Sequence, residues 1–318
     1  MSEPRITPAS WLMIVALGLT WGGTFLMMEI ALRGISPFWL ASGRIGFAAL
    51  LMLAVWSALG FRLFHARPSG EDIAALVAVG MLSSAIPFML LSWGQQYVTS
   101  GFAGVSMAAV ALIVLPLAHF FVPGERLSWR KIAGFVVGFV GVCILIGGQA
   151  FDSTGADREL AGRAACLGAA TCYALSSILM RRLPPVDPIG LATILVIIGS
   201  AVVIPVALAV EGPPPLPDGQ TLAAICFLGL VPTAAANLLR VLVVRSAGPV
   251  FMSLTNYQVP VWSVMLGAVV LGEPLPPSLL LAMALILAGV GLSQYGAFAR
   301  LLRRQPSESD QTPQPPVQ

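Results

Sequence analysis

Long runs of apolar residues make up most of the chain, and short polar or turn-forming segments separate one run from the next. About 20 apolar residues in a helix cross the hydrocarbon core of a bilayer, where backbone groups must be satisfied within the helix itself. The runs predict transmembrane helices over residues 11–30, 37–60, 72–95, 101–122, 131–149, 162–181, 188–210, 219–244, 249–271 and 278–298. The pattern therefore predicts an all-α integral membrane protein with ten transmembrane helices.

The composition agrees with this prediction and removes several classes of protein. Of the 318 residues, 57% are hydrophobic and 10% are charged, whereas about 25% of the residues in a soluble domain are charged. The first run is longer than a signal-peptide core and lacks a small-residue cleavage site, so we interpret it as a retained helix. The four cysteines all fall inside apolar runs, so we expect no disulfide framework, metal site or cofactor.

Basic residues are distributed unevenly between alternate loops, and Lys and Arg near helix ends are retained on the cytoplasmic side of a membrane. With the N-terminus inside, the cytoplasmic side holds Arg5, Arg62, Arg67, Arg126, Arg130, Lys131, Arg181, Arg182, Arg245, Arg300, Arg303 and Arg304. The other side holds Arg33, Arg158 and Arg163. This bias predicts a multi-pass protein of the bacterial inner membrane with both termini in the cytoplasm. The net charge of +3 belongs to these loops, so we expect no nucleic-acid partner.

An internal repeat is visible when Gly124-Glu125 is laid over Gly272-Glu273, because Phe139–Val142 then falls on Leu287–Val290. Each copy holds five spans, and an odd number inverts the second copy in the membrane. Basic residues follow the first Gly-Glu pair and not the second, as inversion requires. The alternative is that long apolar runs align by chance. Inverted repeats place a substrate site near the midplane and permit alternating access, which favours a carrier.

These boundaries divide the chain into five parts. The predicted parts are a cytoplasmic N-terminus (1–10), a first five-helix repeat (11–149), a periplasmic linker (150–161), a second five-helix repeat (162–299) and a disordered cytoplasmic tail (300–318).

Over residues 11–298 the chain resembles the ten-helix EamA-type transporters of the drug/metabolite transporter superfamily. The resemblance rests on the two Gly-Glu turns, the Gly-Val helix after each turn, and Pro260 in the Pro-Val-Trp run. The first half departs from the pattern, because Leu112 stands where the register with Pro260 would place a proline, and Pro116 follows four residues later. The resemblance implies transport of metabolites, and the family includes amino-acid exporters of the YddG type.

Polar residues inside the spans are candidates for a substrate site, because each is costly in lipid. Arg44 lies seven residues after Pro37, about 10 Å below the outer interface. Arg44 can bind a substrate carboxylate, pair with Glu29, or snorkel. We expect Arg240 to snorkel to the inner interface, five residues before Arg245.

Other candidates lie deeper or in groups. Trp21 is at mid-span and can stack on a substrate or pack within the protein. Three successive polar residues, 256–258, cannot all face one partner at about 100° per residue. The candidate substrate-binding residues are Trp21, Thr24, Arg44, Ser84, Tyr173, Asn237, Asn256, Tyr257 and Gln258.

The sequence contains no H-E-x-x-H, Walker A or G-x-S-x-G motif, so we do not expect an enzyme. No acidic residue is centred in a span, so there is no acidic proton carrier. The predicted function is a secondary transporter that exports small organic metabolites by alternating access, above all neutral or aromatic amino acids. The alternatives are a carrier for drugs or other metabolites and a non-transporting receptor or scaffold. The expected partners are a small-molecule substrate and the lipid bilayer. The sequence leaves substrate identity, coupling ion, direction of flux and oligomeric state open, and a monomer satisfies it.

Overall fold

The computed structural model describes residues 6–64, 67–122, 128–147 and 158–303, and these are almost entirely helical. Unbroken helices cross the molecule as α1 (Pro8–Leu32), α2 (Pro37–Ala58), α5 (Ser100–Phe121), α6 (Trp129–Gly147), α7 (Glu159–Met180), α8 (Pro188–Glu211) and α13 (Pro277–Arg303). The described residues form no β-strand, only one isolated bridge between Phe64 and Val186.

Three further spans are each built from shorter helical segments. They are α3 (Gly70–Gly80), π-helical η1 (Met81–Ala85) and α4 (Ile86–Gly94); α9 (Gly219–Leu228), π-helical η2 (Gly229–Ala235) and α10 (Ala236–Ala247); and α11 (Pro249–Met252) with α12 (Thr255–Leu271). The described residues thus contain ten helical segments long and apolar enough to cross a membrane. This confirms the predicted fold class, although the π-helical interruptions of two spans were not predicted.

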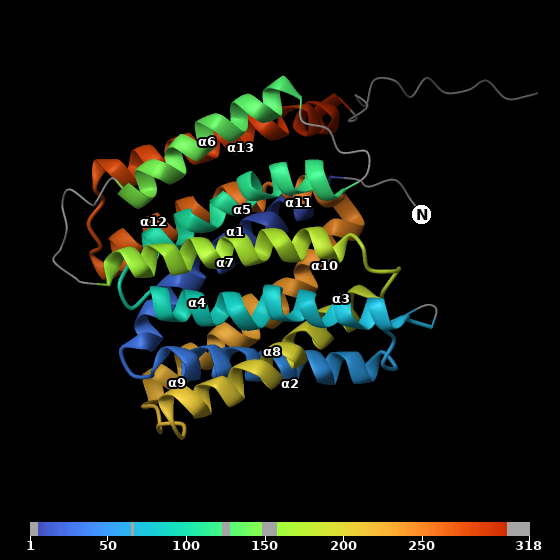
Figure 1. Ribbon diagram of the computed structural model, residues 1–318, viewed down its shortest axis with the longest axis vertical. Helices are drawn as coiled ribbons and strands as arrows, with labels where there is room; N and C mark the ends of the chain where they lie inside the picture. Colours follow the sequence, from blue (N-terminus) through green and yellow to red (C-terminus); the bar gives the residue numbers. More distant parts are fainter. Residues whose placement is uncertain (1–5, 65–66, 123–127, 148–157, 304–318) are drawn as a thin grey trace, which may run out of the picture.

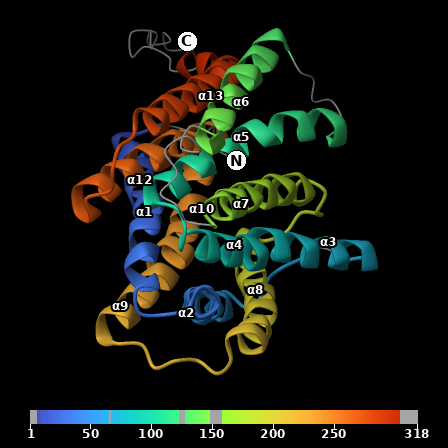
Figure 2. The ribbon, with the colours of Figure 1, turned by 60° about the vertical axis from the view of Figure 1, so that its left-hand side comes forward.

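The spans lie side by side, with their axes across the long direction of the molecule (Figure 1). Helices α6 and α13 pack together at one end, and α2 packs against α8 at the opposite end (Figure 1, Figure 2). Between these pairs, α1 packs against α12, and α5 packs against α7 and α12. Each of these contacts joins a helix of residues 1–149 to one of residues 159–303, so the buried core forms mainly between the two halves of the chain.

Prolines and polar caps set where several helices begin. Pro8, Pro37, Pro188 and Pro277 each occupy the first position of a helix, where a missing N–H costs nothing and a fixed φ is already helical. Before α8, Asp187 adds a side-chain cap, because its Oδ1 accepts hydrogen bonds of 2.9 Å from the next two free amides.

One face of the molecule, here named the Glu-capped face, carries the loops at residues 33–36, 95–99, 212–218 and 272–276. There Glu211, at the end of α8, reaches the start of α2. Its carboxylate accepts hydrogen bonds from the amides of Phe38 (2.9 Å) and Trp39 (3.0 Å) and from the Ser36 hydroxyl (2.6 Å). The opposite face, where α1 begins and α13 ends, is named the N-terminal face.

The predicted Gly272-Glu273 turn forms a second cap of the same kind. Gly272 has a φ of +68°, which a glycine adopts without strain. The chain then turns back so that Glu273 accepts hydrogen bonds from the amides of Ser100 (2.8 Å) and Gly101 (3.0 Å) at the start of α5. A carboxylate stabilises the positive end of a helix dipole, so the motif links the two halves. The Gly124-Glu125 copy lies outside the described residues.

Glycines let α6 and α13 approach until their backbones touch. A Cβ atom at Gly134 would lie 2.5 Å from the carbonyl oxygen of Gly289, and a Cβ at Gly289 would lie 2.5 Å from the amide nitrogen of Gly138. Association of helices in lipid depends on such close packing, because no hydrophobic driving force acts there.

Candidate functional site

Arg44, in the third turn of α2, is buried in the interior with 7% of its surface exposed. Its Nε donates a 2.9 Å hydrogen bond to the hydroxyl of Thr233 in η2. A terminal nitrogen lies 3.4 Å from the sulfur of Met28 in α1, and the guanidinium carbon lies 4.1 Å from the ring centroid of Phe88 in α4. Tyr173 of α7 packs against the buried cluster that contains Phe88. Contacts from α1, α4 and η2 therefore converge on one cation of α2, and α7 lies beside them.

No carboxylate neutralises this cation. Among the described residues, no Asp or Glu oxygen lies within 4.0 Å of the Arg44 guanidinium, so the alternative ion pair with Glu29 is not formed. Snorkelling is not observed either, because the side chain points among α1, α4, α7 and η2. A buried guanidinium whose partners are neutral strongly favours an anion, and carboxylates match its geometry.

The hydroxyl that accepts the hydrogen bond from Arg44 belongs to Thr233, which directly follows a proline in the middle of η2. Pro232 has no N–H to donate, so it interrupts the helical hydrogen bonds within η2. The hydroxyl of Thr233 donates a 2.7 Å hydrogen bond to the carbonyl oxygen of Leu228 and accepts the one from Arg44. The Thr233 hydroxyl thus provides a donor for a backbone carbonyl of the interrupted helix and an acceptor for the Arg44 guanidinium. π-helical turns of this kind occur frequently at functional sites.

Two further candidates from the sequence meet at the same segment. The indole N–H of Trp21 donates a 3.0 Å hydrogen bond to the carbonyl oxygen of Pro232. The Asn237 amide donates a 2.6 Å hydrogen bond to the carbonyl oxygen of Thr233. Trp21, Arg44 and Asn237 therefore all bind the Pro232-Thr233 pair, although three different helices supply them.

The remaining candidates lie elsewhere or point elsewhere. Thr24 is buried and donates to the Thr20 carbonyl oxygen of its own helix. Ser84 is buried in η1, with its Cβ against the backbone of Gly199 in α8.

The three successive polar residues of α12 point in three directions, as their spacing required. Asn256 is exposed, Tyr257 points toward Gly291 of α13, and Gln258 packs against Gly18 of α1. Asn256, Tyr257 and Gln258 therefore do not form one group with Arg44, because they lie on different sides of α12.

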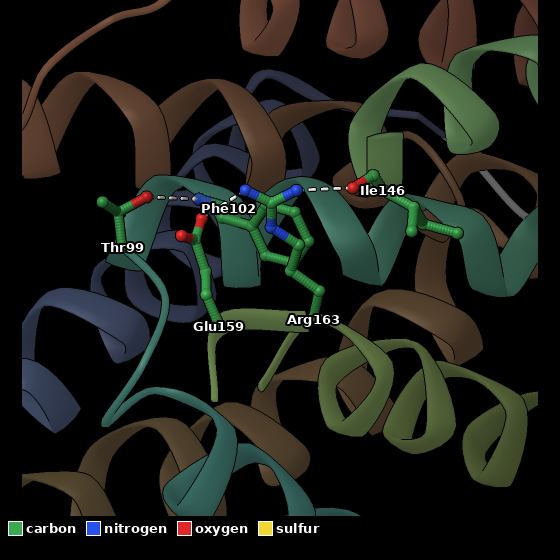
Figure 3. Close-up of polar contacts among 5 residues, drawn as sticks. All are labelled: Thr99, Phe102, Ile146, Glu159 and Arg163. Carbon is green, nitrogen blue, oxygen red and sulfur yellow. Dashed lines mark hydrogen bonds and ion pairs between the residues drawn. The ribbon is translucent and has the colours of Figure 1, made fainter. Parts of the chain in front are cut away.

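A second buried arginine provides a contrast. Arg163, which the sequence places at the start of the predicted span 162–181, lies in the second turn of α7 and is 3% exposed. Figure 3 shows its guanidinium between the Glu159 carboxylate and the carbonyl oxygen of Ile146, above the ring of Phe102. Arg163 has a carboxylate partner within its own helix and ties three helices together. Arg44 has none.

Sequence reasoning missed Met28, Phe88 and Thr233 as neighbours of Arg44. Apolar side chains are abundant in every span, so nothing marked Met28 or Phe88. A usable signal existed for Thr233, because it follows Pro232 in the middle of a span, where a proline frees a carbonyl that a hydroxyl can satisfy.

Comparisons with known proteins cover nearly the whole chain. The model of the EamA-like transporter family matches residues 9–147 and again residues 160–294. A probable terminal-alkyne amino-acid exporter from Streptantibioticus cattleyicolor is 28% identical over 95% of this chain and 98% of its own length. The uncharacterized inner membrane transporter YedA of Escherichia coli (strain K12) is 26% identical over 90% of each chain. One solved crystal structure, 20% identical, superposes with a TM-score of 0.62 over 93% of this chain and 99% of that chain, which indicates a shared fold.

Proposed function

Because this chain belongs to the EamA-like transporter family, we propose that it exports neutral amino acids with apolar or aromatic side chains, and that Arg44 binds the substrate carboxylate. The chain is a multi-pass membrane transporter with a small-molecule substrate. The observation that carries the proposal is the buried Arg44 guanidinium, whose partners among the described residues are neutral side chains from three other spans.

The surroundings of Arg44 support a neutral amino acid as the substrate. A single unpaired cation balances a single carboxylate. Met28, Phe88 and Trp21 supply apolar and aromatic surface for a side chain within the same group of helices. The phenol of Tyr173 and the amide of Asn237 are half-buried and can accept a hydrogen bond from an ammonium group. The relative named as a probable amino-acid exporter supports the same substrate class.

The transport mechanism of the proposal is alternating access by two inverted repeats. Several observations support it. The family model matches each half separately. The π-helical segments η1 and η2 interrupt corresponding spans, the third span of each half. Helix α1 packs against α12 as α7 packs against α5. In this proposal the N-terminal face is cytoplasmic and the membrane is the bacterial inner membrane.

Counterflow of radiolabelled amino acids in proteoliposomes tests the proposal. The wild type should exchange neutral amino acids saturably, and amino-acid amides, which lack the carboxylate, should not compete. Arg44→Ala should abolish exchange while the thermal unfolding transition remains cooperative, and Arg44→Lys should restore only part of it.

Arg245→Ala is the matched control, because Arg245 is exposed in the last turn of α10. Competition by amides equal to that by amino acids contradicts carboxylate recognition. Exchange of a drug or a different metabolite, with no exchange of any amino acid, contradicts the substrate class.

A further inference from the structure

Arg240 lies on the same helix as Thr233 and Asn237, closer to the N-terminal face. Seven residues separate it from Thr233, which corresponds to about 10 Å along the axis. Its helix α10 approaches the N-terminal face beside the first half of α1, because Val243 and Ala247 lie in the same buried cluster as Ile14. Arg240 therefore lies between that face and the Arg44 site.

The side of α10 that carries Arg240 turns away from the lipid. Leu242 is 57% exposed on the outer side of this helix. At about 100° per residue, Arg240 is roughly 160° from Leu242 around the helix axis. Ala236 and Val243, on the buried side, pack against α1 next to it. Arg240 is nevertheless exposed, so the inner side of α10 is not closed by other helices at this level.

Arg240 also has no carboxylate within 4.0 Å among the residues described. From the N-terminal face inward, this span places Arg240 first, then the Asn237 amide, and then Thr233 of η2. Thr233 accepts the hydrogen bond from Arg44, the next cation along this path. Cations placed along an approach raise the local concentration of an anion and its rate of arrival.

We propose that Arg240 is a capture site for the substrate carboxylate, reached from the N-terminal face before the carboxylate passes to Arg44. The proposal rests on the transport function proposed above. The exposed Arg240 guanidinium binds a carboxylate more weakly than the buried Arg44 guanidinium does. The ligand class is a solute with one free carboxylate and an apolar body.

Labelling with a thiol reagent tests the placement of Arg240 without requiring transport. Cys143, Cys166, Cys172 and Cys226 are first replaced by alanine. Arg240→Cys should then react rapidly with an anionic, membrane-impermeant methanethiosulfonate added at the N-terminal face. Leu242→Cys, on the lipid side, should react slowly. Equal, slow reaction of both variants overturns the proposal, because Arg240 then faces lipid.

Kinetics test the role of Arg240 in exchange. With amino acid supplied at the N-terminal face, Arg240→Ala should raise KM about two- to fivefold, as expected for one exposed ion pair, and leave kcat unchanged. Arg240→Lys should restore KM, and Arg245→Ala should not change it. An unchanged KM in Arg240→Ala overturns the capture site even if the position is accessible.

Binding of radiolabelled propionate to the purified protein separates failure of this inference from failure of the proposed function. Propionate binding that is weakened by Arg240→Ala, in a protein that exchanges no amino acid, supports the capture site and contradicts the proposed substrate. Binding lost in Arg44→Ala but unchanged in Arg240→Ala overturns the capture site and retains the Arg44 site.

Discussion

At the scale of single residues, the two buried arginines Arg44 and Arg163 differ in how their positive charge is compensated. Both guanidinium groups are removed from water, which is costly for a charge unless partners compensate. Arg163 is compensated by the Glu159 carboxylate and stabilises a helix junction. Arg44 is held by a hydroxyl, a thioether and an aromatic ring, and its positive charge has no counter-ion among the residues that the structure describes. A substrate anion can supply that counter-ion.

Substitution of Thr233 tests how this cation is held. Thr233→Val keeps the side-chain shape but removes the hydroxyl that serves Arg44 and the Leu228 carbonyl. We expect a loss of about 1–3 kcal/mol in the free energy of unfolding, the cost of leaving buried polar groups unpaired, and a raised KM. Thermal unfolding and counterflow measure the two effects.

The control is Thr233→Ser, which retains the hydroxyl and should behave nearly as the wild type does. Wild-type stability and KM in Thr233→Val would show that this hydrogen bond does not position Arg44.

At the scale of helical elements, two carboxylates from the second half of the chain cap two helices of the first half. Glu211 caps α2, which carries Arg44, and Glu273 caps α5. Both caps lie on the Glu-capped face, so they hold the halves together there. The Gly-Glu motif in the second half is thus structural: Glu273 caps α5, and none of its hydrogen bonds among the described residues reaches Arg44.

Removing one carboxylate charge should weaken this face. For Glu273→Gln we expect a loss of about 0.5–2 kcal/mol in the free energy of unfolding, because the start of α5 loses charge-assisted hydrogen bonds. Thermal unfolding in detergent measures it. Glu71→Gln, an exposed position in the first turn of α3, serves as the control and should change stability by less than about 0.5 kcal/mol. Equal stability of the two variants would contradict a capping role.

The glycine contact between α6 and α13 makes a separate prediction. Gly289→Leu places a side chain where the backbone of α6 lies, so we expect destabilisation of about 1–3 kcal/mol or more from overpacking. Gly147→Ala is the control, because no atom lies within 4 Å of a Cβ added there. Thermal unfolding compares the two, and a Gly289→Leu protein as stable as the control would show that the helices can separate without cost.

At the scale of the whole molecule, most contacts between spans join the two halves, and the Arg44 site takes residues from both. A site shared in this way changes its access when one half moves relative to the other, as alternating access requires. Arg240 is exposed on α10, between the N-terminal face and the Arg44 site.

The charge bias of the loops predicts which face of the whole molecule lies in the cytoplasm. Glu71 begins α3 at the N-terminal face, and Gln220 begins α9 at the Glu-capped face, and both are exposed. In intact cells, an impermeant thiol reagent should label Gln220→Cys and spare Glu71→Cys in a protein without its native cysteines, because basic loops stay in the cytoplasm. The reverse labelling pattern would invert the assigned orientation.

The sequence by itself determined the ten spans, the fold class and the family. A membrane span depends on the length of an apolar run and on the turn residues that end it, and both are local properties of the sequence. It also marked Arg44, Trp21 and Asn237, because polar groups in lipid are rare. Only the tertiary structure decided which candidates lie together. Trp21, Arg44 and Asn237 all hydrogen-bond to Pro232 or Thr233, whereas residues 256–258 point in different directions around α12. The partners of Arg44 come from helices up to 189 residues apart in sequence, and such contacts depend on how whole helices pack.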